Sequence, residues 1–277
     1  MSLRTIALSS SFLLGRRNLY RMSRFLTMCA RGDVPNDLEA NGETLVQEFA
    51  MKCDSSPSIV FDIGANLGNW TASLLQHSKG KAVTVHAFEP CQGTYERLAQ
   101  RVKEECWTNV LAIPQGCART PSTSRMRVYS TGEGTNTLID FYESASANVE
   151  TVDLTSVDEY SLRNRIGYID LLKIDAEGFD FEVIAGATRM LKRNRVRLLQ
   201  FEYNQRWIGT RHYLRDAFLL LGPMGYQIGK LVGTSIEFYS SWHWELETYR
   251  EGNYVACLKD VADRLPQRTP SWLPDAC

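Results

Sequence analysis

Three acidic residues, Glu89, Asp175 and Glu202, each follow an apolar run in the sequence. The runs are short and rich in β-branched and aliphatic side chains, which is typical of buried strands in a parallel sheet. The carboxyl ends of parallel strands meet at one edge of a sheet, and ligands bind in the crevice at that edge. Carboxylates there can accept a proton from a substrate or hydrogen bonds from ligand hydroxyl groups. The sequence therefore predicts a polar site at this edge.

A glycine-rich turn precedes the first of these acids. Residues 58–70 predict a strand, a tight turn and a helix, with Gly64, Asn66 and Gly68 in the turn. Glycine allows a positive φ and close approach to a ligand, and the N–H groups at a helix start can bind an anionic group. Glu89 lies about 25 residues after Gly64, where a βαβ nucleotide-binding unit places the acid that binds ribose hydroxyls. The pattern favours a nucleotide cofactor, although the turn lacks the Gly-x-Gly-x-x-Gly spacing of dinucleotide sites.

The elements that must position these residues alternate as in an α/β fold. The predicted parallel strands are residues 59–63, 82–88, 109–113, 168–175 and 196–201, and residues 226–231, 235–239 and 254–258 suit an antiparallel ending. Residues 126–129 and 149–152 predict an inserted hairpin whose loop lies near the mouth of the site. A helix over residues 37–52 precedes the first strand and could act as a lid, which makes Asn41 and Glu43 candidate ligand contacts.

The composition is that of an ordinary soluble globular protein. The 277 residues are 44% hydrophobic and 23% charged, with a net charge of −1. This balance provides no global field to recruit nucleic acid or an anionic membrane, but it leaves a local patch open. The seven cysteines are scattered without a Cys-x-x-Cys pair, which favours reduced thiols in the cytoplasm, and we predict no metal site.

The N-terminal segment is strongly basic. It carries six arginines in the first 32 residues and no acid before Asp33. An apolar stretch over residues 6–14 is too short to span a bilayer. Residues 12–29 predict a basic amphipathic helix with Leu19 and Phe25 on its apolar side. This helix could cover the active site or make a homo-oligomer contact, and a removable targeting segment is the alternative.

Four blocks of the sequence resemble the FkbM-type family of S-adenosylmethionine-dependent methyltransferases. The blocks are residues 61–68, 87–90, 169–178 and 199–204. The order Lys-Ile-Asp-Ala-Glu-Gly at 173–178 is quite specific, whereas Asp180 stands where members of the family usually carry glutamate. The resemblance implies an α/β, Rossmann-like class I methyltransferase fold, with a seven-stranded, mostly parallel sheet and an antiparallel last strand. It also implies methyl transfer from S-adenosyl-L-methionine to a hydroxyl of a sugar or secondary metabolite.

We accordingly expect three parts in the chain. They are a basic N-terminal helical segment (1–36), a methyltransferase domain (37–260) and a proline-containing C-terminal tail (261–277). The expected partner is a small-molecule acceptor, with no nucleic acid and no membrane span, in the cytoplasm.

The resemblance places the cofactor on the glycine turn and the strand ends beside it. Asp62, Gly64, Asn66 and Gly68 would contact the methionine end, Glu89 the ribose and Ala118 the adenine. The full set of predicted cofactor contacts is Asn41, Glu43, Asp62, Gly64, Asn66, Gly68, Glu89, Pro90, Cys117, Ala118 and Asp175. Cys117 is expected to be a small wall residue, because no basic neighbour is visible that would lower the pKa of its thiol.

Methyl transfer to an alcohol also needs a group that accepts the hydroxyl proton. Asp175 is the first candidate for this base, and a structural role as a helix cap is its alternative. Glu177 and Glu202 are its predicted partners, and Asn204 is predicted to orient the acceptor. The alternative bases are His86, His212 and His243.

Three other functions stay open. N-methylation of a small molecule or a peptide amide would use the same cofactor half of the site. An NAD-dependent oxidoreductase would also place Glu89 on a ribose, but the Gly-x-Asn-x-Gly turn disfavours it. A non-catalytic, methyltransferase-like binding module would have no need of acids at three strand ends.

Overall fold

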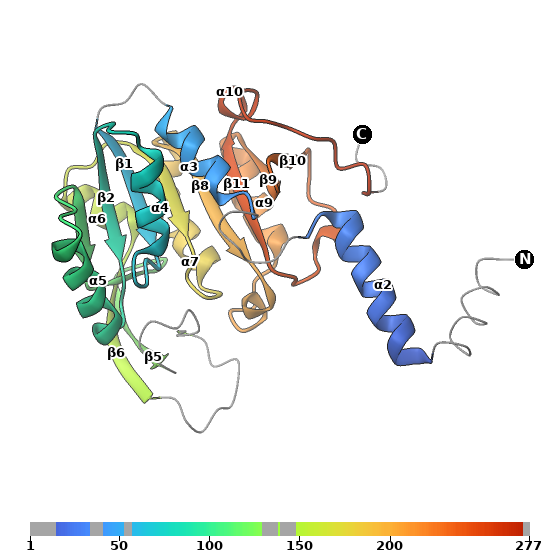
Figure 1. The fold of residues 1–277 in the computed structure, drawn as a ribbon, viewed down its shortest axis with the longest axis horizontal. Coiled ribbons are helices and arrows are strands. Elements are labelled where there is room, and N and C mark those ends of the chain that lie inside the picture. Colours follow the sequence, from blue (N-terminus) through green and yellow to red (C-terminus); the bar gives the residue numbers. More distant parts are fainter. Residues whose placement is uncertain (1–14, 34–40, 53–56, 129–137, 139–147, 274–277) are drawn as a thin grey trace, which may run out of the picture.

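A computed structural model describes residues 15–33, 41–52, 57–128, 138 and 148–273 (Figure 1). The described residues form a central eight-stranded sheet in the order β10-β9-β11-β8-β7-β1-β2-β3. Its strands are β1 (Ser58–Ile63), β2 (Val83–Phe88), β3 (Val110–Ile113), β7 (Ile169–Ile174), β8 (Val196–Tyr203), β9 (Tyr226–Val232), β10 (Ser235–Tyr239) and β11 (Gly252–Leu258).

The strand directions confirm a mostly parallel sheet with an antiparallel end. Neighbouring strands from β3 to β8 pair in parallel, whereas β11 is antiparallel to both β8 and β9. The predicted count of seven strands is one short, because β10 adds an eighth at the edge. Gly233, at a φ of +58°, makes the short turn that returns β10 antiparallel along β9.

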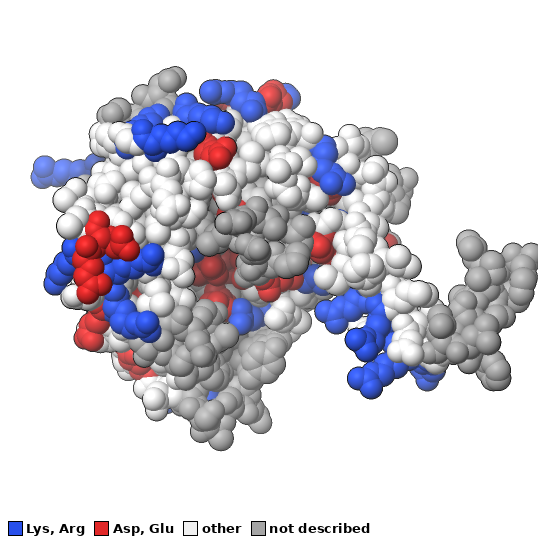
Figure 2. Space-filling model, in the orientation of Figure 1, with Lys and Arg blue, Asp and Glu red and all other residues white. Residues whose placement is uncertain are grey.

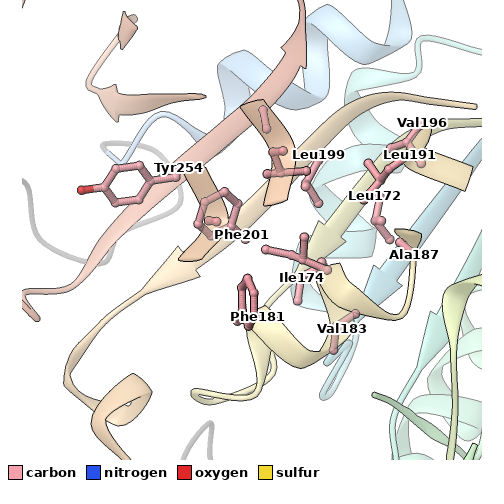
Figure 3. Close-up of a cluster of buried hydrophobic side chains, with 14 of the residues drawn as sticks. Leu172, Ile174, Phe181, Val183, Ala187, Leu191, Val196, Leu199, Phe201 and Tyr254 are labelled. Carbon is pink, nitrogen blue, oxygen red and sulfur yellow. The ribbon is translucent and has the colours of Figure 1, made fainter. Parts of the chain in front are cut away.

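Helices cover both faces of the sheet, so the fold has three layers. Adjacent residues on a strand point to opposite faces. Leu171 therefore packs with α3 (Glu43–Met51), α4 (Asn69–His77), α5 (Gln92–Glu104) and α10 (Lys259–Ala262) on one face. Leu172 packs on the other face with α6 (Val157–Arg163), α7 (Asp180–Ala185), α8 (Thr188–Lys192) and α9 (Leu214–Leu221), and Figure 3 shows part of this cluster. The sequence predicts one helix from residue 179 to about residue 194, whereas the structure has two short helices there, α7 and α8.

A second, smaller sheet lies beside β3. Its order is β4 (Gly116–Cys117), β6 (Asn148–Thr155) and β5 (Ser122–Val128). β5 and β6 pair in antiparallel fashion, which confirms the predicted inserted hairpin. The loop predicted at the mouth of the site lies outside the described residues except for Leu138. Short 3-10 helices connect the later strands: η1 (Gln205–Ile208), η2 (Gly222–Met224) and η3 (Trp244–Leu246).

Helix α2 (Arg16–Arg31) stands out from the α/β body (Figure 1). It confirms the predicted N-terminal helix over the described residues, while residues 12–14 lie outside them. No helix within the described ranges is long and apolar enough to cross a bilayer.

Candidate active site

The turn between β1 and α4 lies against the end of β7. Gly64 has a φ of +77°, and a Cβ there would come within 1.9 Å of the carbonyl oxygen of Asp175. Gly68 has a φ of +78°, and a Cβ there would lie 2.8 Å from Leu98 Cδ1. A backbone contact therefore requires glycine at position 64, whereas at position 68 the positive φ favours it. Because Gly64 permits this approach, Asp175 is brought beside the turn.

Glu89 fastens the same turn to the end of β2. The side chain is buried, and Oε2 accepts a hydrogen bond from the backbone N–H of Asn66 while Oε1 accepts one from that of Cys91, both at 3.0 Å. Burial raises the pKa of Glu89 to about 7. Each carboxylate oxygen keeps a second lone pair. Glu89 can therefore hold the turn and still accept hydrogen bonds from a vicinal diol.

A hollow of about 670 Å³ opens beside Glu89, and we call it the apolar pocket. It is lined by Ile63, Gly64, Asn66, Glu89, Pro90, Thr94, Gly116, Cys117, Met126, Leu138, Asp175, Ala176 and Glu177. The predicted adenine neighbour Ala118 is not among these described lining residues, and its backbone N–H donates to Thr155 at 2.8 Å. Burial raises the pKa of the Cys117 thiol, which keeps it protonated as part of the wall. The apolar walls and the carboxylate of Glu89 suit a nucleoside.

A second hollow of about 630 Å³, the acidic pocket, lies on the other side of the turn. Its lining includes the carboxylates of Glu43, Asp175 and Glu202. Gly64, Asn66 and Asp175 line both pockets, so the two form one elongated site with Asp175 at the junction. Figure 2 shows acidic side chains near the centre of the face of the molecule that it displays.

Lys173, which our sequence analysis did not propose as a site residue, organises the junction. Its buried Nζ lies 3.1 Å from Asp62 Oδ1, 3.5 Å from Asp175 Oδ2 and 3.4 Å from the carbonyl oxygen of Gly64. Burial favours the neutral amine, but the neighbouring carboxylates outweigh it and raise the pKa of Lys173 above its usual value. A charged residue between the apolar Leu172 and Ile174, two positions before Asp175, is the signal that could have revealed it.

Asp62 lies behind the turn. It is fully buried, its Oδ2 accepts a 2.7 Å hydrogen bond from the Thr71 hydroxyl, and its Oδ1 faces Lys173. Among the described residues, neither Asp62 nor Gly68 belongs to the lining of either pocket. Their contact with the cofactor stays a prediction.

The start of α3 brings Glu43 into the acidic pocket. The buried Asn41 side chain accepts a 3.0 Å hydrogen bond from the backbone N–H of Glu43, which satisfies one donor at the helix start. Glu43 Oε1 accepts a 2.6 Å hydrogen bond from Gln200. Burial raises the pKa of Glu43 to about 7, so this acid carries its charge only in part near neutral pH.

Asn204 positions Glu202 and the chain after it. Its Nδ2 donates to Glu202 Oε2 at 2.6 Å, and its Oδ1 accepts from the backbone N–H of Arg206 at 2.8 Å, which caps η1. Asn204 is buried and is absent from the described lining of both pockets, so its predicted role in orienting the acceptor would act through Glu202 and stays a prediction. Burial raises the pKa of Glu202 well above its usual value.

The turn after β7 holds two further acids. Glu177, at a φ of +52°, forms an ion pair with Arg206 and lines the apolar pocket, and burial raises its pKa to about 8. Asp180 is fully buried and accepts hydrogen bonds from the backbone N–H groups of Ala176 and Gly178, at 3.3 and 3.1 Å. Asp180, which stands in place of the glutamate expected from the family resemblance, thus closes the turn from within through these two hydrogen bonds.

The three alternative bases lie elsewhere. His86 contacts the Tyr160 hydroxyl at 2.9 Å, His212 contacts Glu182 at 2.7 Å, and His243 caps η3. None of them is among the described residues that line either pocket. Within the described ranges, no group of three His, Cys, Asp or Glu side chains is arranged to hold a metal ion.

The lining fits S-adenosylmethionine. The ribose would face Glu89, and the sulfonium and ammonium groups would face the carboxylates around Asp175. Lys173 does not cancel this acidic character, because Asp62 already balances its charge. Asn66 Oδ1 is buried and has no hydrogen-bond partner among the described residues, so it offers an acceptor where the two pockets meet.

Comparison with known proteins identifies the family. The profile of a family described as methyltransferase FkbM domain matches residues 62–228. No curated protein matches the chain.

Solved structures with a similar fold are distant in sequence. A methyltransferase FkbM from Methylobacillus flagellatus KT is 17% identical at a TM-score of 0.45, and the match covers 72% of this chain but only 43% of that one. A SAM-dependent methyltransferase from Aquifex aeolicus is 14% identical at a TM-score of 0.41, over 82% of this chain and 95% of that one. An rRNA methylase from Streptococcus thermophilus is 12% identical at a TM-score of 0.42, over 78% and 95%. The family match covers more than half of the 277 residues, so this chain belongs to the FkbM family of S-adenosylmethionine-dependent methyltransferases.

Proposed function

We propose that this protein methylates a hydroxyl oxygen of a small molecule, such as a sugar or a secondary metabolite, in the cytoplasm. The observation that carries the proposal is the place of Asp175 at the junction of the two pockets. Its side chain is 43% exposed, so it can reach a bound acceptor. The acidic surroundings repel phosphate groups, which favours a small uncharged or cationic acceptor over a nucleic acid.

When bound, S-adenosylmethionine supplies the methyl group on a good leaving group. The chain's own contribution is to hold the acceptor oxygen in line with that carbon, at roughly 3 to 3.5 Å. Glu89 would bind the ribose hydroxyls and fix the nucleoside in the apolar pocket. Asp175 would accept the hydroxyl proton, and Lys173, 3.5 Å away, would hold its carboxylate in place.

The proposal is tested by transfer of a labelled methyl group to a panel of sugars, alcohols and amines. Asp175→Asn should lower kcat about 10²- to 10⁴-fold, the usual contribution of a general base, while S-adenosylmethionine still binds. Asp263→Asn on the surface is the matched control and should leave kcat unchanged. Undiminished turnover by Asp175→Asn would remove it as the base.

N-methylation is the second candidate. A cationic amine in the acidic pocket would favour the charged forms of Glu43 and Glu202 and would be held by them, and it must lose a proton before it attacks. The amines in the same panel decide between the two acceptors. Preferential labelling of an amine would replace the hydroxyl in our proposal.

A thermal-shift series separates the remaining classes. S-adenosylmethionine and S-adenosylhomocysteine should raise the unfolding temperature, whereas NAD should not. Stabilisation by NAD alone would favour an oxidoreductase. Stabilisation by S-adenosylmethionine with no methyl transfer to any acceptor would favour a non-catalytic binding module.

A further inference from the structure

Helix α2 has one basic face and one apolar face. The exposed arginines Arg16, Arg17, Arg21 and Arg24 are accompanied by no acidic residue on the helix. At 100° per residue they fall on one side, and Leu19, Met22, Phe25, Leu26 and Cys29 fall on the other. Figure 2 shows basic side chains gathered along one side of α2. This is the pattern of a helix that lies in the interface of a membrane.

Among the described residues, those of the α/β body leave the apolar face of α2 uncovered. Phe25 is 64% exposed, Leu26 58% and Met22 45%. An isolated helix of 16 residues is marginal in water, because most helical stability in proteins comes from packing of an apolar face. A covering surface would therefore stabilise α2 as well as bury these side chains.

Charge complementarity indicates what that surface is. Arginines without a neighbouring acid bind a negatively charged surface, and anionic lipid headgroups beside acyl chains meet the basic and apolar faces together. A second copy of α2 would bring four more exposed arginines and no acid to the contact. Like charges therefore oppose pairing of this helix with itself.

The C-terminal end of α2 is fixed to the body. Arg31 is buried, donates to the carbonyl oxygen of Glu245 at 2.8 Å and stacks over Trp272 at 4.5 Å from the ring centroid. Asp33 forms ion pairs with Arg31 and with Lys230 of β9. A membrane-bound α2 would thus hold the catalytic body close to the bilayer.

We infer that α2 binds the surface of an anionic lipid bilayer, with Phe25 and Leu26 inserted among the acyl chains and the arginines on the headgroups. This inference is independent of the methyl acceptor. The test is co-sedimentation of the full chain with vesicles of phosphatidylcholine alone and of phosphatidylcholine with phosphatidylglycerol at about 3:1. The chain should bind the anionic vesicles, and added salt should weaken binding because it screens the arginines.

Paired variants separate the two faces of α2. Phe25→Glu/Leu26→Glu should abolish sedimentation, whereas Leu162→Glu/Leu219→Glu, at two leucines that are each 60% exposed on other helices, should not. Arg17→Gln/Arg24→Gln should lower the partition coefficient about 30-fold, at about five- to sixfold per arginine. Lys79→Gln/Lys103→Gln makes the same charge change at exposed sites elsewhere and should have little effect.

Two results would overturn the inference. One is equal sedimentation with both vesicle types, or none with either. The other is a dimer in solution that Phe25→Glu/Leu26→Glu dissociates, which would make a second copy the occupant of the apolar face. Thermal unfolding of each variant without lipid checks that the body remains folded.

Discussion

The acids in and around the site differ in what their oxygens contact. Asp62 and Asp180 are fully buried and bonded to the chain, whereas the Asp175 side chain is 43% exposed between the two pockets. Glu89 is bonded to the chain and also lines a pocket. Each of its oxygens accepts one hydrogen bond from a backbone N–H group, and the side chain still lines the apolar pocket. The contacts of each carboxylate, and not its position at a strand end alone, therefore decide which can bind a ligand.

Replacing Glu89 by glutamine should weaken binding of S-adenosylmethionine. The amide has one acceptor oxygen in place of two and no charge, and hydrogen bonds to charged groups contribute about 1.5–3 kcal/mol each. We expect the Kd to rise about 10- to 100-fold in isothermal titration calorimetry. Glu104→Gln, at an exposed position on α5, is the control and should leave the Kd unchanged. A Glu89→Gln variant with unaltered affinity would disprove the ribose contact.

Replacing Lys173 by methionine should destabilise the fold. The fully buried Asp62 would lose the cation that balances it, and breaking a buried pair costs about 3–5 kcal/mol. Urea unfolding measures this loss, and the double variant Asp62→Asn/Lys173→Met should recover much of it because no unpaired charge remains. Lys259→Met, which breaks an exposed pair with Asp263, should cost at most about 1 kcal/mol. Equal effects at Lys173 and Lys259 would contradict this account.

At the scale of elements, the site depends on how closely the β1–α4 turn approaches the end of β7. The Asp175 backbone N–H donates to the carbonyl oxygen of Ile63 at 3.0 Å, and the Asp175 carbonyl leaves no room for a Cβ at position 64. The same approach places Asp175 in both pockets. A turn and a strand far apart in the sequence therefore form the junction together.

Gly64→Ala should be far more damaging than Gly80→Ala. The two glycines have nearly the same φ, +77° and +79°, so the backbone strain on substitution is alike. Only at Gly64 would the new Cβ meet backbone, because nothing described lies within 4 Å of a Cβ at Gly80. We expect the unfolding free energy of Gly64→Ala to fall by at least about 2 kcal/mol more than that of Gly80→Ala, together with loss of cofactor binding. Similar losses at both positions would show that strain alone matters.

At the scale of the whole molecule, the site concentrates buried acids. Burial raises the pKa of Glu43, Glu89 and Asp180 to about 7 and that of Glu177 to about 8. The folded state therefore binds protons at a pH where the unfolded chain has released them. Stability that comes from these groups is present at low pH and is lost as the pH rises through 7 to 8.

The unfolding temperature of the free protein should consequently fall between about pH 6.5 and pH 8. Burial lowers the pKa of His86 to about 4, so His86 opposes this trend only below the ordinary histidine pKa of about 6.5. Differential scanning calorimetry across the range measures the slope, and Glu43→Gln should reduce it. Bound S-adenosylmethionine should flatten it too, because a cation beside the carboxylates favours their charged form. A slope of the opposite sign would show that the acids are ionised in the free protein.

Much of the fold was predictable from local patterns. Apolar runs, glycine turns and intervening helices identify the parallel strands because a strand buried on both faces must be almost continuously apolar. The predicted segments 226–231, 235–239 and 254–258 are all strands of the sheet, so only the count of seven that the family resemblance implies is one short. What the sequence did not predict is that β11 lies between β8 and β9, since pairing depends on the partner strands and not on the segment itself. The break between α7 and α8 was missed for a similar reason, because Gly186 is packed where a Cβ would come within 2.1 Å of the Ala118 carbonyl oxygen.

The sequence by itself determined the family and predicted the edge of the sheet for the site, because both follow from motif order and from the shared direction of parallel strands. Only the tertiary structure decided which acids line the two pockets, since their contacts come from elements distant in the chain. It showed that Asn204 caps η1 and that Asp62 forms an ion pair with Lys173. In the structure, Asp175 lies at the junction of the two pockets. It also showed that α2 stands clear of the body, which an amphipathic pattern leaves undecided because such a face fits a protein core and a lipid surface equally well.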